Sequence, residues 1–498
     1  MPRLKTAQKI RVRFAPSPTG FLHIGSLRTA LYNYLFAKKH SGDFILRIED
    51  TDRTRYVEGG VENIIKTLEW CGLNYNEGPR LNSAEVGEYG PYIQSKRLEI
   101  YKKYVEALVK KGKAYYCVCT PERLENLREQ QMAAKLPTIY DGFCRDKKTT
   151  QEKPVGQHVI RLKVPKIGKT KFEDLIHGQV EFANKLIDDQ VLLKSDGYPT
   201  YHLANIIDDN LMEITHVIRG DEWLPSTPKH ILLYEAFDWK APQFTHLPLL
   251  LNPDHSKLSK RQGDVAVEDY IKKGYLPEAI INFVALLGFN PRSDKELYTL
   301  DELIADFDLV KVNKSGAVVN FEKLDWMNGH YIRTKTLDEL TQLCVPFLIN
   351  AGWPEEIRNP KLEIQNRIKK IVALEQERIK KLADIVDAAE IFRIDQPHYE
   401  PKILVWKKAP KEGVRLHLTA LFAFLTGYKG DWTAQNLEQT IKAWVAKEGR
   451  GVGEVLWPFR VALAGRLASP PPFDIAAILG KAQTLKRLEY AIELAKKL

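Results

Sequence analysis

The chain has 498 residues, which predicts roughly three or four compact domains of about 100 to 200 residues each. Hydrophobic residues make up 44% of the sequence and charged residues 28%, a balance typical of globular proteins that excludes a disordered chain. The formal net charge of +10 suits a polyanionic partner such as RNA, although a basic enzyme without such a partner fits it equally well.

The number of cysteines and the length of the apolar segments indicate the cellular compartment in which the protein is expected. Five cysteines are too few for a disulfide framework in a chain of this length. Residues 1–10 are basic and lack the apolar core of a secretory signal, and the longest apolar stretch, 279–289, is too short to span a bilayer. We therefore expect a cytoplasmic protein with no membrane association, with a mature organellar form as the alternative.

The first 50 residues have the pattern of a βαβ unit. Residues 10–15 alternate apolar and polar side chains as a strand does, and the proline-rich stretch 16–20 excludes a helix there. Residues 26–39 repeat apolar side chains with helical spacing, and 44–48 form the next candidate strand. This order predicts a parallel sheet.

The middle of the chain changes pattern. An amphipathic helix is predicted over 95–111 and is followed, from about residue 115 to 194, by short strands and turns. The clearest strands are 159–164 and 191–193, and the whole segment resembles an insertion into the first sheet.

A helix-then-strand pattern resumes over 221–239 and 244–251. From about residue 337 the chain is mostly helical, with long helical patterns over 364–389 and 434–447. The sequence therefore predicts an α/β part followed by an α-helical part.

A candidate phosphate site lies at the start of the first helix. A helix N-terminus presents unpaired N–H groups, Gly25 lets a ligand approach the backbone, and His23 can donate hydrogen bonds to phosphate. Taken alone, a histidine in this position is more often a capping or packing residue.

A second candidate is the basic segment 255–264, which carries Lys257, Lys260 and Arg261. Such a loop can clamp a triphosphate, whereas a solvated basic turn is the simpler interpretation of the segment by itself.

The two motifs together resemble the paired signatures of class I aminoacyl-tRNA synthetases. Ser26 stands where that signature often has a second histidine, and a serine can still cap the helix and contact phosphate. Further stretches, spread over almost the whole chain, look like the glutamyl branch of the class: 13–20, 47–52, 194–205, 217–223, 324–333 and 457–465.

The resemblance implies an α/β fold with a Rossmann-type parallel-sheet catalytic domain. The expected halves of that domain are 1–98 and 199–252, separated by an inserted acceptor-stem-binding domain at 99–198. A basic-loop and stem-contact domain is expected at 253–334, and an α-helical anticodon-binding domain of the bacterial type at 335–498.

The resemblance also implies the reaction. ATP, with Mg²⁺, activates L-glutamate to glutamyl-adenylate, and the glutamyl group passes to the 3′-terminal adenosine of tRNA(Glu). The implied catalytic residues are His23, Lys257 and Lys260. ATP would be bound by the same three residues together with Gly25, Ser26 and Glu222.

Glutamate carries two carboxylates, for which arginine offers a planar, bidentate fork. By resemblance, Arg13 with Tyr201 and Asn205 holds the side-chain carboxylate, and Arg219 lies near the α-carboxylate. The ammonium group would be received by Glu49 and by the stretch that contains Ala15 and Ser17. The alternative is that the two arginines are ordinary ion-pair partners.

Three cysteines of the insertion suggest a structural zinc site. Cys117, Cys119 and Cys144 have a spacing found in some members of the family, and Tyr140 is the implied fourth ligand. Asp146 stands where a histidine is sometimes found, which leaves the fourth ligand open. Reduced, metal-free cysteines are the alternative.

In the C-terminal part, the family places an arginine at the third anticodon base, and Arg378 falls at that position. The nearest rival functions are a glutaminyl enzyme and a non-discriminating enzyme that charges two tRNAs with glutamate. A non-catalytic RNA-binding protein on the same scaffold is the rival from another class. The family suggests a monomer.

Overall fold

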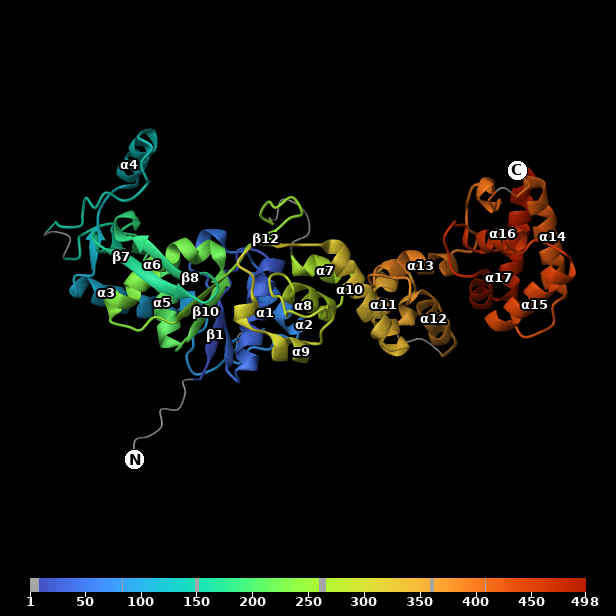
Figure 1. Ribbon diagram of the computed structural model, residues 1–498, viewed down its shortest axis with the longest axis horizontal. Helices are drawn as coiled ribbons and strands as arrows, with labels where there is room; N and C mark the ends of the chain where they lie inside the picture. Colours follow the sequence, from blue (N-terminus) through green and yellow to red (C-terminus); the bar gives the residue numbers. More distant parts are fainter. Residues whose placement is uncertain (1–8, 83, 148–151, 259–265, 359–361, 408) are drawn as a thin grey trace, which may run out of the picture. The chain divides into compact units, whose positions relative to one another are not determined.

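The computed structural model describes residues 9–82, 84–147, 152–258, 266–358, 362–407 and 409–498. The chain divides into two compact units (Figure 1). The first consists of Met1–Ile271 and Pro277–Leu324, and the second of Lys272–Leu276 and Asp325–Leu498. The first unit contains all the described strands, whereas the described part of the second is helical.

The strands, in chain order, are β1 (Arg11–Phe14), β2 (Asp43–Leu46), β3 (Gly78–Pro79), β4 (Glu85–Val86), β5 (Ala114–Cys117), β6 (Val159–Leu162), β7 (Lys169–Asp174), β8 (Gly178–Ala183), β9 (Val191–Leu193), β10 (His216–Gly220), β11 (Gln243–Leu247), β12 (Leu250–Leu251) and β13 (Ala317–Val318). The first ten helices are α1 (Ile24–Lys39), α2 (Gly60–Trp70), α3 (Leu98–Lys110), α4 (Pro121–Ala133), α5 (Tyr201–Leu211), α6 (Thr227–Phe237), α7 (Val267–Lys273), α8 (Pro277–Ala285), α9 (Leu300–Asp306) and α10 (Phe321–Thr334). The remaining helices are α11 (Leu337–Asn350), α12 (Leu362–Glu375), α13 (Asp384–Arg393), α14 (Lys411–Gly427), α15 (Ala434–Lys447), α16 (Val452–Ala464) and α17 (Pro472–Leu494), the last interrupted at Gly480.

The predicted βαβ unit is confirmed. Strands β1 and β2 pair in parallel, with Val12 opposite Phe44, and α1 joins them. Strand β10 lies beside β1, because the N–H of Thr215 donates to the carbonyl of Arg11 at 2.9 Å. The first strand is therefore flanked by chain segments about 30 and 200 residues away in sequence.

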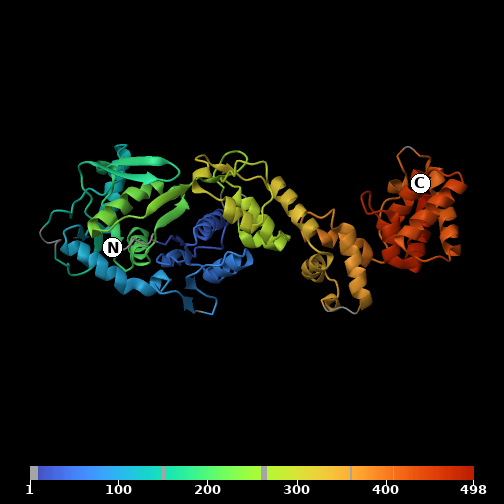
Figure 2. The ribbon, with the colours of Figure 1, turned by 60° about the horizontal axis from the view of Figure 1, so that its bottom comes forward.

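Strand β10 also belongs to a four-stranded sheet of order β10-β11-β7-β8. Its first three strands pair in parallel, and β7 and β8 form an antiparallel hairpin. Helices α3, α5 and α6 contribute apolar side chains to one core with this sheet, and all three lie close to it in both ribbon views (Figures 1 and 2). The predicted strands of the insertion are confirmed as β6 and β9, which join β5 in an antiparallel sheet.

Two predicted elements are interrupted by proline. The helix expected over 221–239 begins as a 3₁₀ helix, Asp221–Ser226, which contains Pro225, and only then becomes α6. The strand expected over 244–251 is split into β11 and β12 around Pro248, whose nitrogen cannot donate to a ladder.

The single long helix predicted over 364–389 is wrong, because α12 and α13 are separate helices. Between them the N–H of Leu382 donates to the carbonyl of Gly274 at 2.9 Å. Asp384 accepts hydrogen bonds from the N–H groups of Lys380 and Lys381 at 2.9 and 2.8 Å. These hydrogen bonds replace the i to i−4 backbone bonds that a continuous helix would make at this point. The helix predicted over 434–447 is confirmed as α15.

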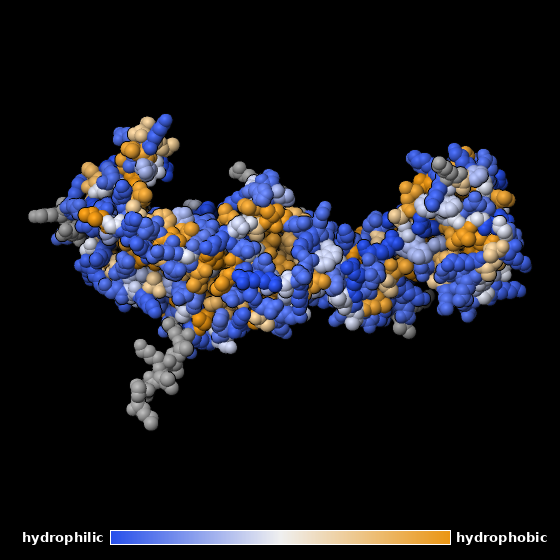
Figure 3. Space-filling view, in the orientation of Figure 1, coloured by the Kyte–Doolittle hydropathy of each residue, from blue (hydrophilic) through white to orange (hydrophobic). Residues whose placement is uncertain are grey.

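Hydrophilic side chains predominate on the face shown in Figure 3, and apolar side chains occur on it in scattered groups. Of the helices in the described residues, none combines the length and the apolar character needed to cross a bilayer.

Candidate active site

A cavity of about 800 Å³ opens where β1 and β10 end. The ends of neighbouring strands in a parallel sheet are the usual place for a ligand site. Most residues predicted to bind glutamate line this cavity, together with two residues predicted to bind ATP: Arg13, Ala15, Ser17, Ser26, Glu49, Tyr201, Arg219 and Glu222. The structure therefore brings together side chains that are up to about 200 residues apart.

A second cavity of about 350 Å³ lies next to the first and shares Ser26 and Glu222 with it. His23, Gly25 and Lys257 line this second cavity. Lys260 lies outside the described residues, but the chain on both sides of that gap reaches the site. Leu258 lines the cavity, and Ala266 pairs with His23 in a β-bridge.

His23 is the N-cap of α1. Its Nδ1 accepts the N–H of Ser26 at 3.1 Å, and its Nε2 is 2.9 Å from the Ser26 hydroxyl. A Cβ at position 25 would lie 3.2 Å from the His23 ring, so a side chain there would press against this ring. Both ring nitrogens of His23 therefore face Ser26, and His23 also lines the smaller cavity.

The floor of the larger cavity is a buried charge network. The Nε of Arg13 is 3.1 Å from Asp209, and no described residue bonds either Nη group of this arginine. Arg47, fully buried, contacts Asp209 at 2.7 Å and Glu49 at 3.0 Å. Burial raises the pKa of the Glu49 carboxyl, and the nearby guanidinium groups of Arg47 and Arg13 oppose this effect. Asp208, 3.8 Å from Arg47, extends the network.

The sequence motifs did not indicate that Arg47, Asp208 or Asp209 belongs to the site. One signal was present, because the two aspartates directly follow the apolar pair Ile206 and Ile207 in a helical pattern. Buried carboxylates in such a place require cationic partners. Which cations these are could not be read from the sequence.

Tyr201 also lines the larger cavity, and its ring lies 4.1 Å from that of Trp223, centroid to centroid. The Tyr201 hydroxyl accepts a hydrogen bond from Nη1 of Arg219 at 3.0 Å. Asn205 lies one helical turn further along α5, and the two polar atoms of its buried amide have no hydrogen-bond partner among the described residues. Asn205 is the one residue predicted to bind glutamate that does not line the cavity.

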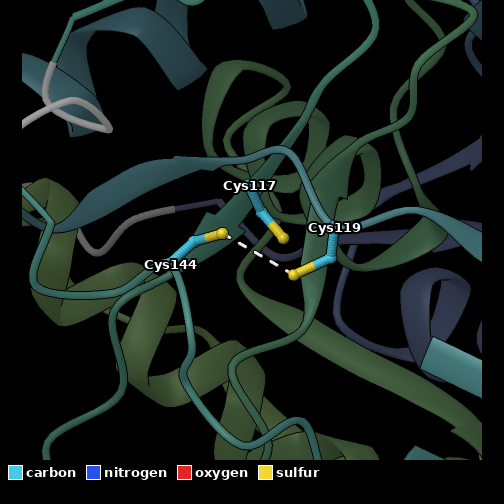
Figure 4. A group of neighbouring side chains, drawn as sticks. All are labelled: Cys117, Cys119 and Cys144. Carbon is cyan, nitrogen blue, oxygen red and sulfur yellow. Dashed lines mark hydrogen bonds between the residues drawn. The ribbon is translucent and has the colours of Figure 1, made fainter. Parts of the chain in front are cut away.

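Three cysteine sulfur atoms converge in the insertion (Figure 4). All lie within 4.8 Å of one another, and those of Cys119 and Cys144 are 3.6 Å apart. The hydroxyl of Tyr140 is 3.5 Å from the sulfur of Cys117 and 3.4 Å from that of Cys119. Tetrahedral zinc with bonds of about 2.3 Å places sulfur ligands about 3.8 Å apart, so this donor set fits the metal. Asp146 instead pairs with Lys163 at 3.1 Å.

Arg378 lies in the second unit, on the wall of a separate cavity of about 370 Å³. Its Nε is 3.2 Å from the carboxylate of Glu375, which is buried. Burial raises the pKa of Glu375 to about 7, although Arg378 opposes the shift. Arg466 lines the same cavity and pairs with Asp387 at 2.9 Å.

Comparison with known families accounts for both units. Residues 9–326 match the family described as "tRNA synthetases class I (E and Q), catalytic domain". Residues 335–492 match the "Anticodon binding domain" family. The first unit thus has the catalytic fold of a class I aminoacyl-tRNA synthetase, and the helical unit is an anticodon-binding domain.

Individual relatives agree along the full length. The glutamate–tRNA ligases of Alkaliphilus metalliredigens and Clostridioides difficile are both 46% identical, and each alignment covers at least 97% of either chain. A crystal structure of the glutamate tRNA ligase from Elizabethkingia meningosepticum, in complex with its amino acid, has a TM-score of 0.86 at 38% identity. It covers 98% of this chain, and this chain covers 99% of it. The chain belongs to the glutamate–tRNA ligase family.

Proposed function

We propose that the larger cavity of this glutamate–tRNA ligase binds L-glutamate and that the neighbouring cavity binds ATP. The observation that carries the proposal is the placement of Arg13, Arg219 and Glu49 around one cavity. Two cations and one anion complement the two carboxylates and the ammonium group of glutamate. The class I fold, shared with the relatives named above, supplies the reaction type.

The roles of the pocket residues follow from charge and geometry. The Nη groups of Arg13 offer a fork to the side-chain carboxylate, since Asp209 takes only Nε. Tyr201 lines the cavity, and Asn205 stands one helical turn further along α5, from where we expect it to support the same end of the pocket. Arg219 receives the α-carboxylate. At the ammonium end lie Glu49, Ala15 and Ser17.

Activation requires little covalent chemistry from the protein. The α-carboxylate of glutamate attacks the α-phosphorus of ATP, and pyrophosphate leaves with the electrons of the broken P–O bond. His23, Lys257 and Lys260 stabilise the charge on the phosphates, while Gly25, Ser26 and Glu222 line the ATP side. The Mg²⁺ that accompanies ATP would neutralise part of the triphosphate charge. A ribose hydroxyl of the terminal adenosine of tRNA(Glu) then attacks the carbonyl of the adenylate, and AMP leaves.

The decisive experiment is glutamate-dependent exchange of pyrophosphate into ATP, measured with and without tRNA(Glu). We expect exchange with glutamate, strongest when tRNA is present, and none above background with glutamine. Exchange supported by glutamine but not glutamate would refute the substrate assignment. A complete absence of exchange in both conditions would refute the enzymatic proposal.

The remaining roles belong to the same proposal. Cys117, Cys119, Cys144 and Tyr140 would hold one structural Zn²⁺, which ties the end of β5 to the loop that follows α4. Arg378 would read the third anticodon base. The five-domain division, a monomeric state and a cytoplasmic location are likewise proposed, on the strength of the sequence patterns.

A further inference from the structure

Three histidines form a cluster at Arg219, which lines the larger cavity, and the reaction just proposed assigns them no task. His202, His230 and His246 come from α5, α6 and β11. His230 and His246 contact the guanidinium group of Arg219, and His202 contacts His230. His230 and His246 are fully buried. Polar groups at such depth need a defined arrangement of donors and acceptors.

The guanidinium group of Arg219 is held by uncharged acceptors. Its Nε donates to Nε2 of His246 at 3.1 Å, and its Nη1 donates to the Tyr201 hydroxyl at 3.0 Å. Its Nη2 lies 2.8 Å from the Thr227 hydroxyl and 3.1 Å from Nδ1 of His230. Four of the five N–H groups of an arginine are thereby used. Among the described residues no carboxylate pairs with Arg219, and the fifth N–H, on Nη1, is left for a ligand in the cavity that Arg219 lines.

Arg13, across the same cavity, is a contrast. It pairs with the carboxylate of Asp209, so part of its charge is compensated inside the protein. A buried arginine with neutral partners keeps its charge for an anion that arrives from outside, because the low-dielectric surroundings screen it weakly.

The protonation of His246 follows from its second partner. Nδ1 of His246 is 2.7 Å from Oδ2 of Asp174, and Oδ1 of Asp174 accepts the N–H groups of Ile176 and His177 at 3.0 and 2.9 Å. An ionised carboxylate only accepts, so Nδ1 of His246 must carry the proton and Nε2 is an acceptor toward Arg219.

The protonation of His230 also follows from its partners. Nδ1 of His230 accepts from Arg219, which leaves the proton of the neutral ring on Nε2. That nitrogen is 3.0 Å from Nδ1 of His202, the acceptor at the end of the branch. Burial lowers the pKa of His202 and His246 to about 4 and that of His230 well below its usual value, and the positive charge of Arg219 acts in the same direction.

We propose that Asp174, His246, His230 and His202 are positioning residues that present Arg219 to the α-carboxylate of glutamate with its charge uncompensated. The proposal rests on the assignment of Arg219 to that carboxylate. A carboxylate in place of His230 or His246 would also hold the guanidinium group of Arg219, but it would neutralise the charge that the substrate needs. Neutral rings in fixed tautomers supply the geometry without the counter-charge.

The test compares two nearly isosteric variants. In His230→Asn the side-chain oxygen can take the place of Nδ1, and in His230→Asp the same position carries a negative charge. We expect the KM for glutamate, measured by pyrophosphate exchange with tRNA, to rise less than about threefold in His230→Asn and about 10- to 100-fold in His230→Asp. The KM for ATP should change less than about twofold in both.

Equal KM values for glutamate in the two His230 variants would overturn the proposal, because a merely structural residue does not distinguish them. The control is His216→Asn, on the same strand as Arg219, where the ring packs against Phe36 at 5.0 Å and contacts Thr215. We expect its KM for glutamate to match that of the unaltered protein.

Arg219→Gln separates this proposal from the one on which it rests. If that variant leaves the KM for glutamate unchanged, the assignment of Arg219 is wrong and both proposals fail. If it raises the KM while the two His230 variants are alike, only the positioning role fails.

The tautomer of His246 can be measured by NMR, which does not depend on catalytic activity. In ¹⁵N-histidine-labelled protein, with the His246→Gln variant for assignment, we expect the Nδ1–H tautomer of His246. In Asp174→Asn the side-chain amide can donate to Nδ1, and the proton should move to Nε2. The Nε2–H tautomer in the unaltered protein would contradict the inferred chain of donors.

Discussion

At the scale of single residues, the proposed glutamate pocket would use the shape of arginine as well as its charge. In Arg13→Lys the charge remains, but the fork offered to the side-chain carboxylate is lost. We expect the KM for glutamate to rise about 10- to 100-fold, with a much smaller change for ATP. The matched control is Arg11→Lys, on the same strand, where the side chain pairs with Asp43 and Glu77 and does not line the cavity. Equal effects in the two variants would contradict the assigned role.

The buried histidines also make stability depend on pH. The pKa of His246, about 4 in the folded protein, lies below its value of 6.5 in an unfolded chain. Unfolding therefore takes up a proton between these values, so the free energy of unfolding falls as the pH drops from about 6.5 to 4, by up to about 1.4 kcal/mol per pH unit for each such ring.

The free energy of unfolding, measured by denaturant titrations across this pH range, should depend less steeply on pH in His246→Gln, because the glutamine cannot bind the proton. Replacement of the exposed His40 by glutamine serves as the control and should leave the slope unchanged. A slope that is the same in all three proteins would show that His246 does not titrate in this window.

At the scale of elements, the proposed zinc site would tie the end of β5 to the loop that follows α4. We expect about one zinc ion per chain in protein purified without chelator, and its loss in Cys144→Ser. Tyr140→Phe should retain zinc less firmly when chelator is added. Cys344→Ala, which alters a buried cysteine of α11 outside the cluster, should keep the metal. The measurement is the zinc content by elemental analysis. A clear absence of zinc in the unaltered protein would refute the proposed zinc site.

The turn between α12 and α13 carries Arg378, which the buried carboxylate of Glu375 anchors. We expect Arg378→Gln to relax the discrimination between tRNA(Glu) and a glutamine tRNA about tenfold, as the loss of one charged hydrogen bond predicts. Arg393→Gln is a matched control, because Arg393 also pairs with a glutamate three residues earlier, at 2.6 Å, on the helix α13. The measurement is kcat/KM for aminoacylation of each tRNA, and unchanged selectivity would end this assignment.

At the scale of the whole molecule, local patterns were sufficient for much of the architecture. The βαβ unit at the N-terminus, the strands of the insertion and the helix α15 are predicted correctly, since each shows a repeat of apolar residues within a single element. The motifs that resemble the glutamyl synthetases extend over both units, and the family comparison bears out that resemblance.

The sequence by itself thus determined the family, the α/β and helical parts of the chain and eight of the residues that line the larger cavity, because short motifs and periodicity are local properties. Only the tertiary structure decided which buried charges meet. Asp209 joins Arg13 and Arg47, and Asp174 reaches His246 from 72 positions away. The physical reason is that a buried polar group must find a partner, but any compatible group that the fold brings near will satisfy it.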